Sequence, residues 1–100
     1  MYVARPLLRI TLFTREHCSL CTQAKFVLDK VQTRNPFQYA QFDVMKSGNE
    51  KWRIYEFDVP VIHIEKANGP TPWETSENAK KLMHRFSQED VEAAMDEVSV

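Results

Sequence analysis

The pattern of hydrophobic and polar positions predicts strands and helices in alternation. The stretch Leu7–Thr14, LLRITLFT, has few charges and is rich in leucine, isoleucine, threonine and phenylalanine, as expected of a strand covered on both faces. From Ser19 to Arg34 the apolar residues return at helical spacing. Pro36 then stops the helix, because proline disfavours helical geometry in the residue before it. We therefore expect a central strand followed directly by a helix.

The middle of the chain predicts two more strands separated by a short helix. Aromatic and apolar residues between Phe37 and Val44 indicate the second strand, and residues 50–57 are expected to form the helix. The side chains expected to reach the sheet from this helix are Trp52, Ile54 or Tyr55. Pro60–Glu65, PVIHIE, is expected to be the third strand, with its proline at the first residue, where a missing N–H donor is tolerated.

The last third of the chain predicts a loop, a strand and a helix. Residues 67–78, ANGPTPWETSEN, hold two prolines and a glycine and are expected to form a loop insertion. Residues 81–86 fit helical and strand spacing equally well. Ser87, followed by acids, is a helix N-cap signature, so the new helix starts there and 81–86 is assigned to a strand. The predicted order is βαβαββα.

Composition limits the classes of function. A chain of 100 residues is enough for one domain, here 1–100 with the insertion at about 67–79. A net charge of −1 gives no electrostatic footprint for nucleic acid or for an anionic membrane, and the apolar runs are too short to span a bilayer. The start of the chain lacks the pattern of a secretory signal. We expect a monomer in a reducing compartment, the cytoplasm or the mitochondrion.

The two cysteines are the clearest candidate chemistry. Both lie in FTREHCSLC, at positions 18 and 21, where the first predicted strand meets the first predicted helix. The CxxC spacing fits a redox-active dithiol, half of a metal site, or two small buried hydrophobes. In a reducing compartment a persistent structural disulfide is not expected, so the pair favours catalysis or metal binding.

This order of elements, together with three segments, resembles a known family. The segments are FTREHCSLCTQAK, WRIYEFDVPVIHI and LMHRF. The chain resembles small glutaredoxin-like proteins of the thioredoxin superfamily over nearly its whole length, except for the insertion. The resemblance implies an α/β thioredoxin-like fold of the glutaredoxin type, a four-stranded mixed sheet flanked by helices. It also implies thiol–disulfide oxidoreductase activity on protein disulfides or glutathione mixed disulfides.

The position of the pair suits disulfide exchange. The thiolate is the nucleophile, and a free cysteine, with a pKa of about 8.5, is mostly protonated near neutral pH. The first turn of a helix stabilises the anion through unpaired N–H groups and the helix dipole, and Arg15 adds a positive charge. We expect Cys18 to be the nucleophile and Cys21 the resolving thiol. His17 can add to this stabilisation, but a solvent-facing loop histidine is the favoured interpretation.

The resemblance implies a cis peptide bond between Val59 and Pro60, placed opposite Cys18. The residues alone would favour an ordinary trans proline at a strand start, because cis bonds are uncommon even before proline. A cis bond would turn the backbone of Val59 towards the dithiol, where its N–H and C=O can pair with an extended substrate.

Whether glutathione is a co-substrate is left open by the sequence. The resemblance implies that Arg15, three positions before the first cysteine, binds a glutathione carboxylate and that Val59 pairs with the cysteinyl backbone of the tripeptide. The family's glycine pair is replaced by Phe86 and Ser87, with Glu89 near the position of the following acid, so we expect weakened binding. The helix starting at Ser87 still offers N–H groups to a carboxylate. No tightly bound cofactor is expected, and a protein disulfide or a partner reductase is the alternative electron source.

Two rival classes of function remain open. A structural zinc site needs four ligands, and this chain supplies two thiols that His17, His63 and His84 would have to complete. His63 and His84 are more often packing or surface groups in such strands, so no metal ligand is assigned. An iron–sulfur cluster bridging two subunits would need a strong glutathione site. A redox-inactive binding module with Trp73 as its contact residue is disfavoured by the intact dithiol.

Overall fold

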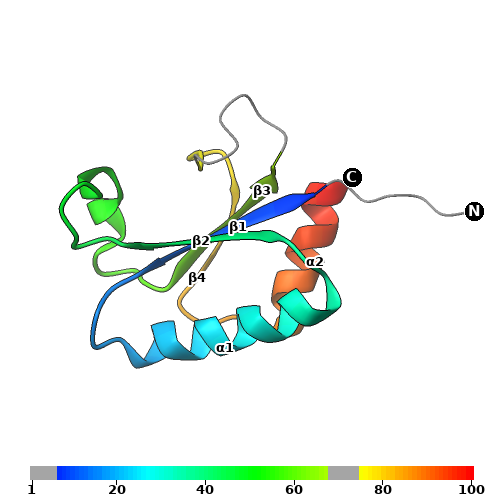
Figure 1. Cartoon of the computed structure of the whole chain (residues 1–100), viewed down its shortest axis with the longest axis horizontal. Coiled ribbons are helices and arrows are strands. Elements are labelled where there is room, and N and C mark those ends of the chain that lie inside the picture. Colours follow the sequence, from blue (N-terminus) through cyan, green and yellow to red (C-terminus); the bar gives the residue numbers. More distant parts are fainter. Residues whose placement is uncertain (1–6, 68–74) are drawn as a thin grey trace, which may run out of the picture.

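The described part of the chain forms a four-stranded mixed sheet with helices packed on it (Figure 1). A computed structural model describes residues 7–67 and 75–100. The elements are β1 Leu8–Thr14, α1 Ser19–Arg34, β2 Gln38–Asp43, the 3₁₀ helix η1 Glu50–Tyr55, β3 Val61–Lys66, β4 Lys80–Met83 and α2 Gln88–Ser99. Their order is the one that the sequence predicts, and the α/β class is confirmed.

The strand order β2-β1-β3-β4 makes β1 a central strand. β1 pairs in parallel with β2 and antiparallel with β3, and β3 pairs antiparallel with β4. Every residue of β1 is buried, as expected of a strand covered on both faces. In this register Phe13 lies between Phe42 and Val61, so the ends of β1 and β2 and the start of β3 meet at one end of the sheet.

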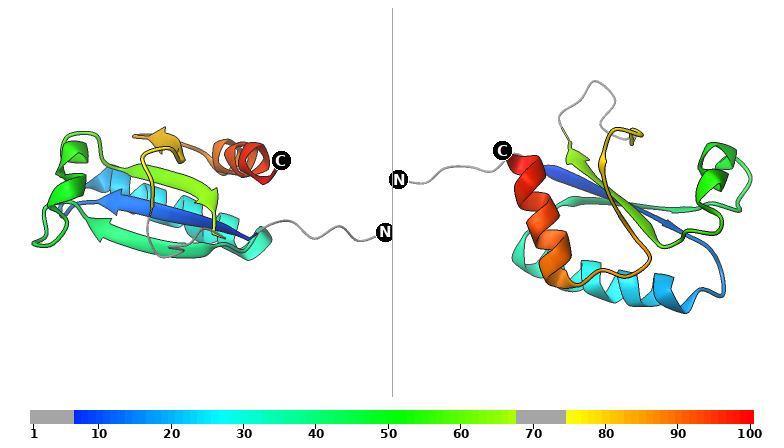
Figure 2. Two further views of the ribbon diagram at one scale, coloured as in Figure 1. Left: turned by 90° about the horizontal axis from the view of Figure 1, so that it is seen from above. Right: turned by 180° about the vertical axis from the view of Figure 1, so that it is seen from behind.

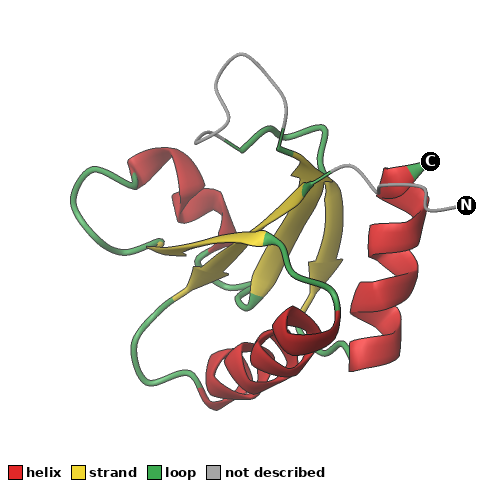
Figure 3. Ribbon diagram, turned by 45° about the vertical axis from the view of Figure 1, so that its right-hand side comes forward, coloured by secondary structure: helices red, strands yellow, loops and turns green. Residues whose placement is uncertain are grey.

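Both α-helices pack on one face of the sheet (Figures 2 and 3). Alternate residues of β1 and β3 point to this face and meet the apolar stripes of the helices. The buried members of this core are Leu8, Ile10, Leu12, Ala24, Leu28, Val31, Phe37, Ile62, Ile64, Val91, Ala94 and Met95. α1 ends at Arg34, and its C-cap Asn35 directly precedes Pro36, as predicted. The core therefore fixes α1, and with it the residues that precede the first turn of α1.

The opposite face carries an aromatic cluster around a buried histidine. Trp52 and Tyr55 of η1 pack on Phe13, with ring centroids 4.7 Å and 5.2 Å away. His63 of β3 is fully buried among these rings, and burial lowers its pKa to about 4. His63 is thus a packing group, as the sequence favoured. Its Nε2 and Nδ1 lie 2.8 Å from the hydroxyls of Tyr55 and Thr75.

The hydrogen bonds of His63 continue to a buried ion pair. The Thr75 hydroxyl donates to Glu65 Oε2 at 2.5 Å, so its oxygen accepts the Nδ1–H of a neutral His63, whose Nε2 accepts from Tyr55. Arg9 is 5% exposed and its Nη2 lies 3.5 Å from Glu65 Oε1. Its Nε and Nη1 have no hydrogen-bond partner among residues 7–67 and 75–100. This face is therefore held by an aromatic cluster and a network of polar contacts, whereas the other face is covered by the two α-helices.

Two predicted details differ from the structure, and a third cannot be compared with it. β4 ends at Met83 rather than at residue 86, because His84 adopts a left-handed backbone with φ 66°. The helix expected over 50–57 is a 3₁₀ helix that ends at Tyr55, and it leaves Ile54 exposed. Most of the predicted loop, with Trp73, lies outside the described residues.

Candidate active site

The two cysteines lie at the start of α1. Cys18 is the N-cap of the helix, one position before the first turn in which the sequence placed it, and its Sγ accepts a hydrogen bond from the N–H of Cys21 at 3.1 Å. The two form a disulfide, with 5.2 Å between their Cα atoms. The sulfurs are therefore close enough to exchange between dithiol and disulfide without movement of the helix.

The two cysteines have different access to solvent. Cys18 is partly exposed, whereas the Cys21 residue is 1% exposed. The first turn of α1 holds no acidic residue, so the positive end of the helix dipole is not neutralised there. A thiolate at Cys18 is accessible and stabilised, and Cys21 lies beneath it. This arrangement matches a nucleophile followed by a resolving thiol.

The peptide bond between Val59 and Pro60 is cis, as the resemblance implied. Pro60 directly precedes β3, at the sheet end where the chain leaves β1 towards Cys18. The Pro60 carbonyl accepts from the N–H of His84 at 2.7 Å. The Val59 N–H donates to the Tyr55 carbonyl at 3.1 Å, so a substrate that pairs with this N–H would have to replace that hydrogen bond. Pairing of Val59 with a substrate stays a prediction. The carbonyl of Val59 accepts no hydrogen bond from the described residues.

Arg15 is held by the segment that leads to the cis peptide bond. Its Nη1 donates to the backbone carbonyl of Glu56 at 2.9 Å and lies 3.9 Å from the carboxylate Oε2 of the same residue. Sequence reasoning placed a free positive charge here and gave no signal for Glu56. The contact joins the loop before Cys18 to the loop before Pro60.

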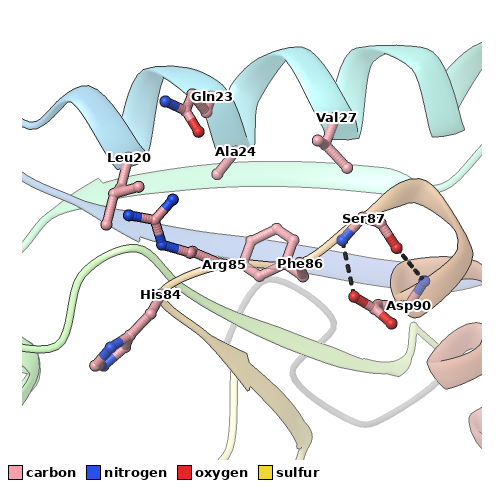
Figure 4. Close-up of a pocket in the computed structure, with 9 residues that line it drawn as sticks. All are labelled: Leu20, Gln23, Ala24, Val27, His84, Arg85, Phe86, Ser87 and Asp90. Carbon is pink, nitrogen blue, oxygen red and sulfur yellow. Dashed lines mark hydrogen bonds between the residues drawn. The ribbon is translucent and has the colours of Figure 1, made fainter.

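A cavity of about 270 Å³ lies between α1 and the segment joining β4 to α2 (Figure 4). Leu20, which stands between the two cysteines, lines it together with Ala24, Val27 and Phe86. Its polar lining residues are Gln23, His84, Arg85, Ser87 and Asp90. In Figure 4 the guanidinium of Arg85 extends towards α1 beside Leu20, and Arg85 has no partner among the described residues. The cavity thus offers an apolar surface that begins at Leu20 and the cation of Arg85.

The N-terminus of α2 is closed by a capping box. The Ser87 hydroxyl accepts from the N–H of Asp90 at 3.1 Å, and the Asp90 carboxylate accepts from the N–H of Ser87 at 2.9 Å (dashed in Figure 4). Both Glu89 and Asp90 lie in the first turn of α2, and Asp90 is the acid that forms the capping box. The Ser-x-x-Asp spacing is the sequence signal that reveals it. The left-handed position that favours glycine falls at His84 rather than at Phe86.

The three histidines have different surroundings. His17 is exposed and, like His84, has a positive φ, 57°. His84 Nε2 lies 3.5 Å from Asp58 Oδ1, whereas His63 lies on the face opposite α1 and α2. Within residues 7–67 and 75–100 no group of three or more His, Cys, Asp or Glu side chains could hold a metal ion. Nor is any helix in that part of the chain long and apolar enough to cross a membrane.

The chain matches one protein family and resembles several solved structures. The model of a family described as a glutaredoxin-like domain (DUF836) matches residues 9–96. A structural-genomics target protein from X. campestris superposes with a TM-score of 0.62 at 19% identity, covering 88% of this chain and 96% of that one. A protein from Nitrosomonas europaea gives 0.65 at 21% identity, with 93% and 96% covered. Thioredoxin-2 of a malaria parasite gives 0.69 at 16% identity, with 95% and 86% covered. At these identities the three structures support the thioredoxin fold alone.

Proposed function

Because the chain belongs to the glutaredoxin-like domain family, we propose that it is a thiol–disulfide oxidoreductase. One observation carries the proposal: Cys18 and Cys21 share a disulfide at the uncompensated N-terminus of α1, with Cys18 accessible and Cys21 buried. A pair of buried structural thiols needs neither this difference in access nor the helix end. The substrates are disulfides of proteins or mixed disulfides with glutathione, and the compartment is a reducing one such as the cytoplasm.

The proposed cycle begins with the dithiol form. The Cys18 thiolate attacks one sulfur of a substrate disulfide, whose S–S bond breaks, and the other substrate sulfur leaves as a thiolate that takes a proton. Cys21 loses its proton and attacks Cys18 in the mixed disulfide. The second substrate thiol is released, and the Cys18–Cys21 disulfide forms. The substrate gains two electrons, which the dithiol gives up.

The groups around Cys18 have separate roles in this cycle. The N–H of Cys21 donates to Cys18 Sγ, which stabilises that sulfur as an anion both before attack and as a leaving group. Pro60 and Val59 shape the surface beside it, where the carbonyl of Val59 is available to a substrate N–H. A thiol or dithiol donor, glutathione or a partner reductase, then returns the disulfide to the dithiol. No tightly bound cofactor enters the cycle, and a single chain suffices for it.

Single-turnover exchange with a disulfide-bonded peptide tests the proposal. The reduced protein should convert the peptide to its dithiol and become oxidised itself, as measured by thiol trapping and mass spectrometry. Cys18→Ser should lose the exchange, and Cys21→Ser should accumulate a mixed disulfide at Cys18. Ser19→Ala, which alters an exposed residue between the cysteines, is the matched control and should retain the exchange. Full activity in Cys18→Ser would refute the proposal.

A further inference from the structure

We propose that the dithiol acts on protein disulfides in preference to mixed disulfides with glutathione. The inference rests on the proposed function and narrows its substrate class. Glutathione is a small tripeptide with two carboxylates, so its binding beside Cys18 depends on cations and free N–H groups there. In this structure three such groups are occupied by partners from the chain itself.

The first occupied group is the guanidinium of Arg15. Its Nη1 contacts both the carbonyl and the carboxylate of Glu56. A ligand carboxylate at Arg15 would have to displace Glu56 or sit beside it, and two like charges at that distance repel. Arg15 therefore positions the loop before Pro60, and the Glu56 carboxylate already compensates the positive charge of Arg15.

The second occupied group is the N-terminus of α2. A helix end attracts anions through its free N–H groups and its dipole. Here the carboxylate of Asp90 accepts the N–H of Ser87, and the Ser87 hydroxyl accepts the N–H of Asp90. The Asp90 carboxylate already supplies the negative charge that this helix end favours. A glutathione carboxylate would therefore gain little there and would be repelled by Asp90.

The third occupied group is the N–H of Val59, which donates to the Tyr55 carbonyl. A short peptide disulfide can therefore form one backbone hydrogen bond at Val59 rather than two. Arg85 is the cation left in the cavity without a described partner, and one cation pairs with one of the two carboxylates of glutathione.

A protein substrate does not depend on these groups, because it can contact a larger apolar surface. Phe57, which is 86% exposed, and Ile54, which is 63% exposed, flank Glu56 on the chain that leads to Pro60. The apolar side of the cavity begins at Leu20, between the cysteines. A chain segment on each side of a substrate cysteine can bury such residues, and aromatic contacts of this kind dominate protein recognition.

Two substrates built on one peptide measure the preference. The first is a disulfide between two copies of the peptide, and the second is the same peptide carrying glutathione on its cysteine. Reduced protein is mixed with each in single turnover, and release of the peptide thiol gives kcat/KM. Reduced protein supplies both electrons, so no other donor is needed. One exposed charge contact changes binding about two- to fivefold, and the contacts of glutathione at Arg15 and at the N-terminus of α2 are both blocked. The kcat/KM of the wild-type protein should therefore be at least about fourfold higher for the peptide disulfide.

Two conservative variants test the cause of the preference. Glu56→Gln and Asp90→Asn remove one charge each and keep an oxygen that accepts a hydrogen bond. Each should shift the ratio of the two kcat/KM values towards the glutathionylated peptide by about two- to fivefold, and together by the product. Glu97→Gln is the matched control, because Glu97 on α2 pairs with Lys80 of β4 and does not line the cavity. It removes one negative charge and should leave the ratio unchanged. A ratio is independent of the fraction of folded protein in each sample.

A second measurement uses S-methylglutathione, which cannot exchange. It should not inhibit peptide exchange by the wild-type protein at millimolar concentration, and it should inhibit Glu56→Gln/Asp90→Asn. Equal or faster reaction of the wild-type protein with the glutathionylated peptide would overturn the inference, as would ratios that do not move in the variants. Reaction with neither substrate would instead refute the proposed function, so the two failures are distinguishable.

Discussion

Lowering the pH should destabilise this protein through His63. The imidazole is fully buried between Tyr55 and Thr75, and its pKa falls from 6.5 to about 4 because burial disfavours the charged form and Lys81 repels it. In the unfolded chain the same imidazole titrates near 6.5. Between these two values the unfolded chain holds a proton that the folded protein does not. The stabilisation is therefore complete above about pH 6.5 and is lost as the pH falls towards 4.

The size of the effect follows from the two pKa values. At pH 5 the unfolded state gains about 2 kcal/mol from protonation of His63 that the folded state does not gain, and the limit below pH 4 is about 3 kcal/mol. For a domain this small, about 2 kcal/mol is a large share of a total free energy of unfolding of about 5–15 kcal/mol. It corresponds to a drop of about 1–2 M in the urea midpoint.

Urea unfolding of the oxidised protein at pH 7 and pH 5, followed by circular dichroism at 222 nm, measures the effect. Other groups also titrate in this range, so the comparison is with His63→Gln. The variant lowers stability at both pH values because it disturbs a buried network, but it lacks the titrating imidazole. Its free energy of unfolding should fall about 2 kcal/mol less than that of the wild-type protein between the two pH values. An equal fall in the two proteins would refute the reasoning.

Three further predictions concern stability, each measured as the free energy of unfolding in urea at pH 7. Ser87→Ala should cost about 1 kcal/mol, because it removes the N-cap that accepts the N–H of Asp90 at 3.1 Å; no loss would mean that α2 does not need its capping box. Leu28→Ala should cost about 2–5 kcal/mol through a cavity in the core, whereas exposed Phe26→Ala on the same helix should change stability by less than about 0.5 kcal/mol. Glu65→Leu should cost about 3–5 kcal/mol by leaving Arg9 as an uncompensated buried charge, and Arg9→Met added to it should restore most of that loss. A double variant no more stable than Glu65→Leu would contradict the last prediction.

The regular elements were legible in the sequence because each had a local cause. Three signals depend only on neighbouring residues: the leucine, isoleucine, threonine and phenylalanine of β1, the helical stripe up to Pro36 and the cap at Ser87. All three elements lie where these signals place them. The end of β4 was not legible. Its alternation continues to Phe86, and the left-handed backbone at His84 stops the strand while its N–H bonds Pro60, a partner distant in sequence.

The candidate site was predictable in its thiols and less so in their surroundings. The CxxC spacing and the helix start identify Cys18 and Cys21 by local pattern, whereas the cis bond before Pro60 came from resemblance alone. Glu56 carries no local signal, because its role arises from a contact with a residue 41 positions away. Asp90 was available from the Ser-x-x-Asp spacing. The surroundings of the thiols depend on contacts between loops that are distant in sequence, which local patterns do not predict.

The place of β1 in the sheet affects how the protein can be assembled during synthesis. β1 precedes the other strands in the chain, yet it has neighbours on both sides, and its antiparallel partner β3 ends only at Lys66. At translation rates of about 5–20 residues per second, roughly 3–10 s separate the emergence of β1 from that of β3. During this interval LRITLFT keeps at least one hydrogen-bonding edge open. On the ribosome the edge strand β2 is therefore available to β1 before the central strand β3, and β1 remains without its second neighbour until β3 has emerged.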